Sequence, residues 1–216
     1  VLTPTRELAA QVYENIRDYS KHLKIRSAVV WGGVKAASQI ATLRRGVDIL
    51  VATPGRLLDL HDQKAVSFKR IDVLILDEAD RMLDMGFARD LNKIISFMPH
   101  KRQNLLFSAT FSKEIKKLAQ GILKNPVMVE AEPENSTAEM VTQKVYQVDK
   151  KKKTEVVTNL IKDGNWNQVL IFTRTKHGAN KLTKKLIQAK ITAAAIHGNK
   201  SQGARTKALS NFKTND

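Results

Sequence analysis

Short apolar runs alternate with amphipathic stretches along the whole chain. The apolar runs, at residues 26–31, 48–52, 73–76, 103–107 and 127–130, predict strands. Because these runs are apolar throughout rather than at every second position, they suit a parallel sheet that is covered on both faces. Two intervening stretches predict amphipathic helices with a hydroxyl residue placed to cap them, Thr5 before residues 6–23 and Ser112 before residues 113–123.

An acidic, proline-containing stretch at residues 130–140, EAEPENSTAEM, interrupts this alternation and predicts a linker. Beyond it the alternation resumes, with strands predicted at residues 142–148, 168–172 and 192–196 and helices at 151–162, 176–189 and 202–212. We therefore expect an α/β fold of two parallel-sheet domains. The first domain is expected at residues 1–131, the linker at 132–140 and the second domain at 141–216. The linker would let the two domains close on each other.

The composition is that of an ordinary globular protein. Of the 216 residues, 42% are hydrophobic and 27% are charged, which allows real cores to be buried. The absence of cysteine excludes a disulfide scaffold and any thiolate metal site, and no apolar run approaches the roughly 20 residues of a membrane span. We expect a soluble, cytoplasmic protein. The chain opens on VLTPT, which resembles the end of a strand, and stops at LSNFKTND after a helical pattern, so we also expect a fragment cut at both ends.

The positive charge is unevenly distributed. Lys and Arg number 37 against 21 Asp and Glu, which gives a net charge of +16. Residues 150–216 alone carry 15 basic and 3 acidic side chains, a net of +12. A polyanion is therefore the first partner to consider, and a generally solvated surface is the alternative explanation.

Three carboxylates, Asp77, Glu78 and Asp80, directly follow the apolar run at residues 73–76. In open α/β sheets, ligands bind beyond the carboxyl ends of the strands, and an aspartate at that place can hold Mg²⁺ through its water shell. A neighbouring carboxylate such as Glu78 could orient and deprotonate an attacking water. The alternative is that these acids only stabilise the N-terminus of a following helix through its dipole.

Hydroxyl and glycine residues follow other predicted strands. FSAT at residues 107–110 contributes two hydroxyls, and VATPGR at 51–56 and WGG at 31–33 contribute backbone amides, a hydroxyl and Arg56. The hydroxyls could hydrogen-bond the acids one strand away, and the amides could hold a phosphate chain. Taken alone, each stretch is better explained by turn and cap chemistry.

Taken together, the stretches are far more specific. PTRELA (4–9), GG (32–33), TPGR (53–56), DEAD (77–80), SAT (108–110), LIFTRT (170–175) and HGNKSQGAR (197–205) occur in the order and spacing typical of the DEAD-box RNA helicases of superfamily 2, which the chain resembles over essentially its whole length. LIFTRTKHGANKL and AAAIHGNKSQGAR look most like the bacterial RhlE-type branch of that family.

The resemblance implies two RecA-like domains that close over ATP and RNA and couple ATP hydrolysis to local separation of RNA duplexes. It implies that Asp77 holds Mg²⁺ through water and that Glu78 positions the hydrolytic water. Asp80 would pair with the hydroxyls of Ser108 and Thr110, which links the nucleotide state to the grip on RNA. The cation and the hydroxyl donors would then compensate the clustered acids.

The resemblance also implies contacts to the sugar-phosphate backbone of RNA. The matching residues are Thr5, Arg6, Glu7, Gly33, Thr53, Gly55 and Arg56 in the first domain and Thr173, Gly198, Gln202 and Arg205 in the second. Backbone contacts carry no sequence information, so RNA binding should tolerate any sequence and should weaken with salt. By analogy with the bacterial branch, complexes of ribosome assembly or RNA turnover are expected partners, and a membrane is not.

The chain departs from the family pattern because it contains no G-x-x-x-x-G-K-[ST] phosphate loop. HGNKS at residues 197–201 lacks both the upstream glycine and the adjacent Gly-Lys pair of that motif. In the family, the phosphate loop precedes PTREL, and arginine-finger motifs follow the helix predicted to end near residue 212. We therefore expect both domains to be incomplete, and we expect the 216-residue chain to lack ATPase activity although its parent protein hydrolyses ATP.

Two alternatives to an ATP-dependent RNA helicase stay open. The first is a non-catalytic RNA-binding protein derived from a helicase, which the intact Asp77, Glu78, Ser108 and Thr110 disfavour. The second is a DNA-directed helicase of superfamily 2, which would be expected to differ in PTREL and around TPGR.

Overall fold

The computed structural model of the chain describes residues 1–130 and 142–214. The chain divides into two compact units, Val1–Thr137 and Ala138–Asp216. The linker predicted at residues 132–140 lies outside the described residues, and the domain boundaries at 131 and 141 stay predictions.

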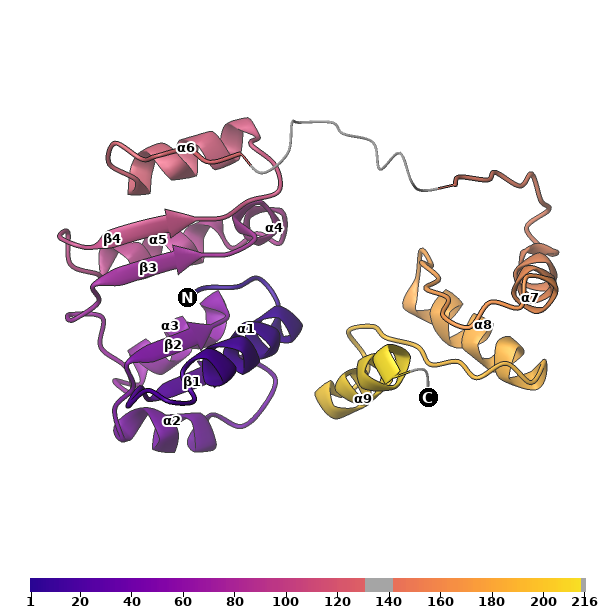
Figure 1. Ribbon diagram of the computed structural model, residues 1–216, viewed down its shortest axis with the longest axis horizontal. Coiled ribbons are helices and arrows are strands. Elements are labelled where there is room, and N and C mark those ends of the chain that lie inside the picture. Colours follow the sequence, from indigo (N-terminus) through magenta and orange to yellow (C-terminus); the bar gives the residue numbers. More distant parts are fainter. Residues whose placement is uncertain (131–141, 215–216) are drawn as a thin grey trace. The chain divides into compact units, whose positions relative to one another are not determined.

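The first unit alternates helices with short strands, as Figure 1 shows. In chain order its elements are α1 (Arg6–Tyr19), β1 (Ser27–Val30), α2 (Ala36–Arg44), β2 (Ile49–Ala52), α3 (Pro54–Asp62), β3 (Val73–Leu76), α4 (Ala79–Asp84), α5 (Ala88–Ser96), β4 (Gln103–Leu106) and α6 (Lys113–Ile122).

The four strands form two parallel pairs. β1 pairs with β2, with Ser27 opposite Ile49, and β3 pairs with β4, with Val73 opposite Gln103. Four of the five strands predicted for this half of the chain are confirmed, and so is their parallel arrangement. The α/β class of the fold is therefore confirmed.

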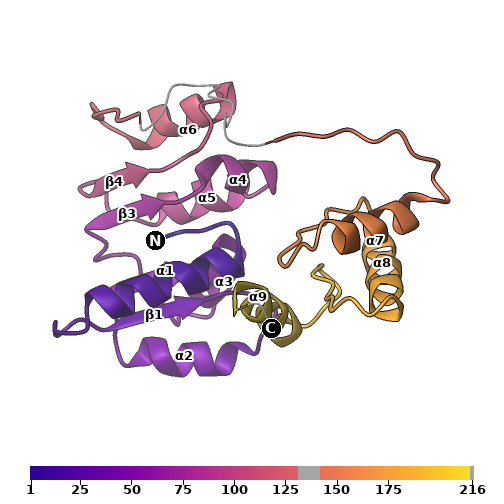
Figure 2. The ribbon, with the colours of Figure 1, turned by 45° about the vertical axis from the view of Figure 1, so that its right-hand side comes forward.

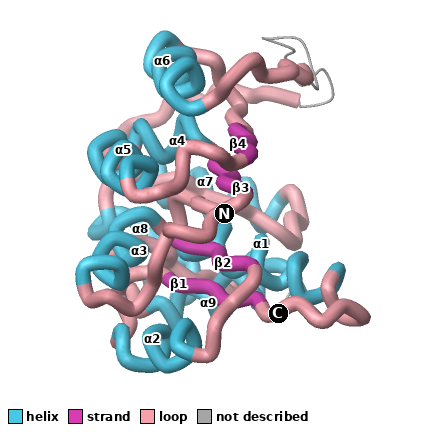
Figure 3. The backbone as a smooth tube through the Cα atoms, turned by 90° about the vertical axis from the view of Figure 1, so that its left-hand side faces the viewer, coloured by secondary structure: helices cyan, strands magenta, loops and turns pink. Residues whose placement is uncertain are grey.

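The first residues of the chain join the two strand pairs. The Leu2 N–H donates to the Ile75 carbonyl at 2.8 Å, and the Asp77 N–H donates to the Leu2 carbonyl at 3.0 Å. On the other side, the Thr3 N–H donates to the Ala52 carbonyl at 3.0 Å. Figures 1 and 3 both show the N-terminus between β2 and β3. The order across this layer is therefore β1, β2, residues 1–3, β3, β4, and the strands all point in one direction.

Helices cover both faces of this layer. Figure 3 shows α1 on one face and α3 and α5 on the other, and α3 lies against α5. The largest fully buried side chains of this unit are Leu2, Thr3, Val30, Val51, Pro54, Leu60, Leu76, Met82, Leu91, Ile94 and Ile115. Burial of a strand layer from two sides is the reason why its strands are apolar at most positions.

Local sequence decides where two of the helices begin. The Thr5 hydroxyl accepts a hydrogen bond from the Leu8 N–H at 3.2 Å at the start of α1. The Ser112 hydroxyl accepts one from the Ile115 N–H at 3.4 Å at the start of α6. In each helix the hydroxyl satisfies an N–H that has no carbonyl partner in the first turn. Both predicted caps are confirmed.

The strand predicted at residues 127–130 is wrong. These residues follow α6 and belong to no ladder in the described part of the chain. Val127 and Val129 are 89% and 86% exposed. An apolar, β-branched run favours extended backbone, but a strand also needs a neighbour that takes up its N–H and carbonyl groups, and these residues have no such neighbour among those described.

The second unit contains α7 (Lys153–Asp163), α8 (Lys176–Gln188) and α9 (Gln202–Thr214), close to the predicted positions. α7 lies beside α8, as Figure 2 also shows. The strands predicted at residues 142–148, 168–172 and 192–196 are wrong, since the structure places these described segments outside any strand. Leu170 and Phe172 are 67% and 88% exposed, so no covered sheet forms around them. The reason is again pairing, which an apolar run alone does not supply.

The described helices are also too short or too polar for a bilayer. A membrane crossing needs about 20 apolar residues in one helix, and no helix within residues 1–130 and 142–214 meets that requirement.

Candidate functional site

The predicted acids lie at the edge where β3 and β4 end. Asp77 follows β3 directly and is half-buried, with its N–H bonded to the Leu2 carbonyl. Glu78 comes next and is exposed. On the neighbouring strand, the Phe107 N–H donates to the Leu76 carbonyl at 2.8 Å and so continues the strand pairing up to this edge. Both carboxylates are therefore held at the carboxyl end of a parallel layer, where ligands bind in open α/β sheets.

Glu78 has an unusual backbone conformation. Its φ of 50° and ψ of 54° lie in the left-handed region, which costs a non-glycine residue about 1–2 kcal/mol. The Ala79 N–H donates to the Phe107 carbonyl at 3.0 Å, and the Met82 N–H donates to the Glu78 carbonyl at 3.0 Å in the first turn of α4. The sheet edge and the helix together hold Glu78 in this conformation. Backbone strain of this kind concentrates at functional sites.

Asp80 is bonded to the loop that follows β4. Its Oδ2 accepts hydrogen bonds from the Thr110 N–H at 3.0 Å and from the Thr110 hydroxyl at 2.9 Å. The Ser108 hydroxyl donates to the Thr110 carbonyl at 2.7 Å. Ser108 is also one of the hydrogen-bonding residues that lower the pKa of Asp80. Burial alone would raise the pKa of Asp80, but hydrogen bonds, above all from the Thr110 hydroxyl, outweigh it and hold that pKa below its ordinary value. The ionised form of Asp80 is therefore the one that fits this loop.

We expect Thr110→Val to raise the pKa of Asp80 toward its ordinary value, because the substitution removes a donor to the ionised carboxylate. A carboxylate with a depressed folded pKa stabilises the fold above its unfolded value of about 3.9, and this contribution is lost as the pH falls through the folded pKa. The variant should therefore lose less stability than the parent when the pH falls below about 4. A carboxyl ¹³C NMR titration measures the pKa directly.

The matched control for this titration is Thr42→Val, whose hydroxyl donates to the Ser38 carbonyl on an exposed helix. It should leave the pKa of Asp80 unchanged. An Asp80 pKa that is the same in Thr110→Val and in the parent would contradict the interpretation.

Three further predicted residues lie at the start of α1. Thr5 is its N-cap residue, and Arg6 and Glu7 are its first two residues. Gly33, in the loop between β1 and α2, has a φ of 77°, and a Cβ at this position would overlap the Arg6 guanidinium. Two segments that are separated in sequence are thus in close contact here. The backbone angle favours glycine, and a larger residue here would also have to displace the Arg6 side chain.

Thr53 and Gly55 lie where β2 passes into α3. Thr53 is the N-cap residue of α3 and is buried at 8% exposure, and its N–H donates to the Val30 carbonyl at 3.1 Å. Gly55 is exposed in the first turn of the helix. The exposed backbone of this turn is the part that a ligand can approach.

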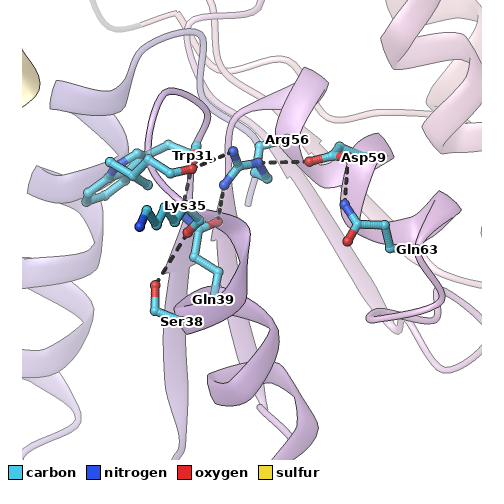
Figure 4. Close-up of polar contacts among 8 residues, drawn as sticks. Trp31, Lys35, Ser38, Gln39, Arg56, Asp59 and Gln63 are labelled. Carbon is cyan, nitrogen blue, oxygen red and sulfur yellow. Dashed lines mark hydrogen bonds and ion pairs between the residues drawn. The ribbon is translucent and has the colours of Figure 1, made fainter.

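Arg56 is engaged within the protein. Its guanidinium donates to the Gln39 side-chain oxygen at 3.1 Å and to the Val34 carbonyl at 2.9 Å, and it forms an ion pair with Asp59 at 3.1 Å (Figure 4). Gln39 in turn donates to the Trp31 carbonyl at 3.0 Å. Sequence reasoning missed Gln39, because a glutamine within a helix carries no signal of a loop contact.

In the second unit, the first turns of α8 are bonded to the loop before α9. Lys176 Nζ donates to Asn199 Oδ1 at 2.9 Å, and His197 Nε2 lies 3.0 Å from Asn180 Oδ1. The Asn199 N–H donates to His197 Nδ1 at 3.3 Å, so Nδ1 is the acceptor, Nε2 carries the proton and the imidazole is neutral. Partial desolvation, followed by nearby positive charges, lowers the pKa of His197 and favours this neutral form.

The remaining predicted residues lie in the loop before α8, in the loop before α9 and in α9 itself. The Thr173 hydroxyl donates to the Thr175 carbonyl at 3.1 Å, and Gly198 follows His197 in the second loop. Gln202 and Arg205 lie in the first turns of α9. Thr173 therefore lies just before α8, and Gly198 lies in the loop that is bonded to the first turns of α8.

No group of three or more His, Cys, Asp or Glu side chains that could enclose a metal ion occurs within residues 1–130 and 142–214. A magnesium ion that is bound mainly through water and phosphate oxygens does not require such a group.

Two family models match the chain. The model for the DEAD/DEAH box helicase matches residues 1–118, and the model for the helicase conserved C-terminal domain matches residues 152–216. The first match contains every predicted site residue of the first unit, and the second contains every one of the second unit.

Proposed function

Because the chain belongs to the DEAD/DEAH box helicase family, we propose that its residues serve the ATP-dependent separation or remodelling of RNA duplexes. A parallel strand layer between covering helices, as in the first unit, is the architecture expected of a RecA-like helicase domain. The observation that supports the proposal best is the acidic edge of β3 and β4. There, Asp77 and Glu78 stand beside the bonded pair of Asp80 and Thr110, with 2.9 Å between the Asp80 carboxylate and the Thr110 hydroxyl.

The donor chemistry of this edge fits a magnesium nucleotide. Mg²⁺ prefers oxygen ligands and usually takes one or two carboxylates together with water and phosphate oxygens. Asp77 would hold the ion through water, and Glu78 follows Asp77 directly at the same edge. When bound, the ion supplies positive charge to the phosphate chain.

Glu78 is the proposed base. Its exposed carboxylate is free to orient a water molecule and to accept its proton, and the left-handed backbone fixes where that carboxylate emerges from the sheet edge. Asp80 is occupied by Thr110 and so is not a candidate for proton transfer. Its role is to link the end of β3 to the Ser108–Thr110 loop, so that a change at one strand end moves the other.

The proposed RNA contacts lie on the loops and helix starts of both units. They are Thr5, Arg6, Glu7, Gly33, Thr53, Gly55, Thr173, Gly198, Gln202 and Arg205. Arg56 is predicted with them, but its guanidinium is engaged within the protein. Backbone amides and hydroxyls on such loops suit the sugar-phosphate chain, and the net charge of +12 on residues 150–216 adds a general attraction. Holding one strand in a shape that a duplex cannot adopt would then separate the strands through deformation energy.

The sequence supports two narrower proposals. LIFTRTKHGANKL and AAAIHGNKSQGAR favour the bacterial RhlE-type branch, for which ribosome-assembly or RNA-turnover complexes in the cytoplasm are the proposed setting. The domain boundaries at residues 131 and 141 are proposed as they were predicted.

The test of the function is ATP hydrolysis by the polypeptide encoded by the whole gene, measured with and without single-stranded RNA. We expect Mg²⁺-dependent turnover that RNA stimulates and that single-stranded DNA of the same sequence does not. Equal stimulation of ATP hydrolysis by DNA would favour a DNA-directed helicase. ATP hydrolysis that neither RNA nor DNA stimulates would refute the proposal.

We expect the 216-residue chain alone to show no ATP turnover above background, because it contains no G-x-x-x-x-G-K-[ST] sequence to hold the phosphates. Phosphate release with Mg²⁺, ATP and single-stranded RNA measures this. The control is the Glu78→Gln variant of the same chain, which removes the proposed base. Turnover in the parent chain that the variant abolishes would show that the chain is sufficient for catalysis.

A further inference from the structure

The loop between β1 and α2 is held by two side chains from outside it. Gln39, in α2, donates from Nε2 to the Trp31 carbonyl at 3.0 Å, and Arg56, in α3, donates from Nη2 to the Val34 carbonyl at 2.9 Å. Arg56 Nη1 also donates to Gln39 Oε1 at 3.1 Å, which joins the two side chains. Figure 4 shows the resulting network. The carbonyls on either side of Gly32 and Gly33 are therefore bonded to two connected side chains.

Arg56 has its charge and its donors committed to this network. Asp59 forms an ion pair with its Nε at 3.1 Å, and the Arg56 side chain is only 10% exposed. Asp59 is held in turn by Gln63, whose Nε2 donates to Asp59 Oδ1 at 2.8 Å. A phosphate would have to compete with Asp59 and with two acceptors for this guanidinium. These contacts indicate that Arg56 holds the loop in place and is not well placed to bind a ligand directly.

The other side of the loop lies against α1. Gly33 has a φ of 77°, and the Arg6 guanidinium occupies the space that a Cβ would need. Gly33 is exposed, so its backbone remains open to a ligand while the rest of the loop is fixed. Fixing a loop before binding reduces the entropy that binding would otherwise lose.

We propose that Gln39 and Arg56 are positioning residues, which hold the 31–35 loop so that the backbone of Gly32 and Gly33 can receive a phosphate of the RNA chain. The RNA part of this inference rests on the proposed function. Gln39 gains a role that its sequence position does not suggest, and Arg56 acts through the loop instead of gripping phosphate itself.

The first test reports the loop without any RNA. Trp31 and Trp166 are the two tryptophans of the chain, so a Trp166→Phe background leaves Trp31 as the only indole. In this background we expect Gln39→Ala and Arg56→Ala each to raise acrylamide quenching of Trp31 by about twofold, as local opening exposes the half-buried ring. The matched control is Gln63→Ala, which loses an amide at the far end of the network and should leave quenching unchanged.

The second test is binding of a fluorescent single-stranded RNA over a range of KCl concentrations. We expect Gln39→Ala and Arg56→Ala each to weaken binding about tenfold, because the displaced loop no longer holds its backbone amides toward the phosphate. The slope of log K against log salt should stay unchanged, because these amides carry no charge. Arg56→Lys should weaken binding as much as Arg56→Ala, because an ammonium cannot bridge Gln39 and the Val34 carbonyl in the fork geometry of arginine. The double variant should bind little more weakly than either single variant, because both residues act through one network.

The outcomes separate the two proposals. Unchanged Trp31 quenching in both alanine variants overturns the positioning role, whatever happens to RNA binding. A slope that falls by about 0.7 in Arg56→Ala alone, with Gln39→Ala binding normally, overturns it too, because it identifies a direct phosphate contact. If quenching of Trp31 rises in the alanine variants but the parent chain does not bind RNA, the two residues do hold the loop, and the proposal that the loop receives RNA is refuted. Circular dichroism of each variant confirms that the fold is retained.

Discussion

Replacing Glu78 by Gln in the whole-gene polypeptide is expected to lower the RNA-stimulated kcat for ATP hydrolysis by about 10²- to 10⁴-fold, the range that a general base contributes. The amide keeps the size and shape of the carboxylate but cannot accept the proton of an attacking water. The left-handed backbone of residue 78 is held by the Ala79 and Met82 hydrogen bonds, which involve main-chain groups only. The fold should therefore be unchanged, and steady-state phosphate release measures the effect.

The matched control for this change is Glu14→Gln, on the exposed face of α1. It makes the same chemical change away from the acidic edge and should leave kcat within about twofold of the parent value. Unimpaired turnover in Glu78→Gln would assign proton transfer to another group. A lower melting temperature in Glu78→Gln than in the control would show that the loss reflects damage to the fold.

The second large effect concerns stability. Leu76→Ala is expected to lower the free energy of unfolding of the first unit by about 2–5 kcal/mol, because it removes a fully buried side chain and leaves a cavity. Leu76 is the last residue of β3 and is 1% exposed. A loss of this size is a large share of the roughly 5–15 kcal/mol that stabilises a typical domain. Urea unfolding followed by Trp31 emission, in the Trp166→Phe background, measures it.

Leu23→Ala is the control for the same chemical deletion. Leu23 is 59% exposed, so its loss should change the free energy of unfolding by no more than about 0.5 kcal/mol. Equal effects of the two substitutions would contradict the assignment of Leu76 to the core. The stability of this strand end also bears on function, because Asp77 follows Leu76 directly.

Local patterns predicted much of the first unit correctly. A hydroxyl before an amphipathic stretch is enough to place a helix start, as Thr5 and Ser112 show, because the cap bonds an N–H only three residues away. The runs at residues 49–52 and 73–76 are apolar because a layer covered on both faces buries most of their side chains, although Val73 stays exposed. Such features depend on neighbours in the sequence or on burial alone.

Strand pairing was predicted less well. The apolar run at residues 168–172 has the same character as the run at residues 73–76, yet only the second pairs with a neighbour among the described residues. A single run cannot reveal whether a partner strand will lie beside it. The side chain of Leu170 is consequently 67% exposed, whereas that of Leu74 is 2% exposed.

The sequence by itself determined the α/β class, the places of α1, α6, α7, α8 and α9, the two predicted caps and the set of residues that identifies the family. The tertiary structure decided which strands exist, that Thr110 bonds Asp80 through both its N–H and its hydroxyl, and that Arg56 joins Gln39 to hold a loop. The physical reason is distance along the chain. Asp80 and Thr110 are 30 residues apart and Gln39 and Arg56 are 17 apart, so their hydrogen bonds exist only after the sheet has brought the segments together.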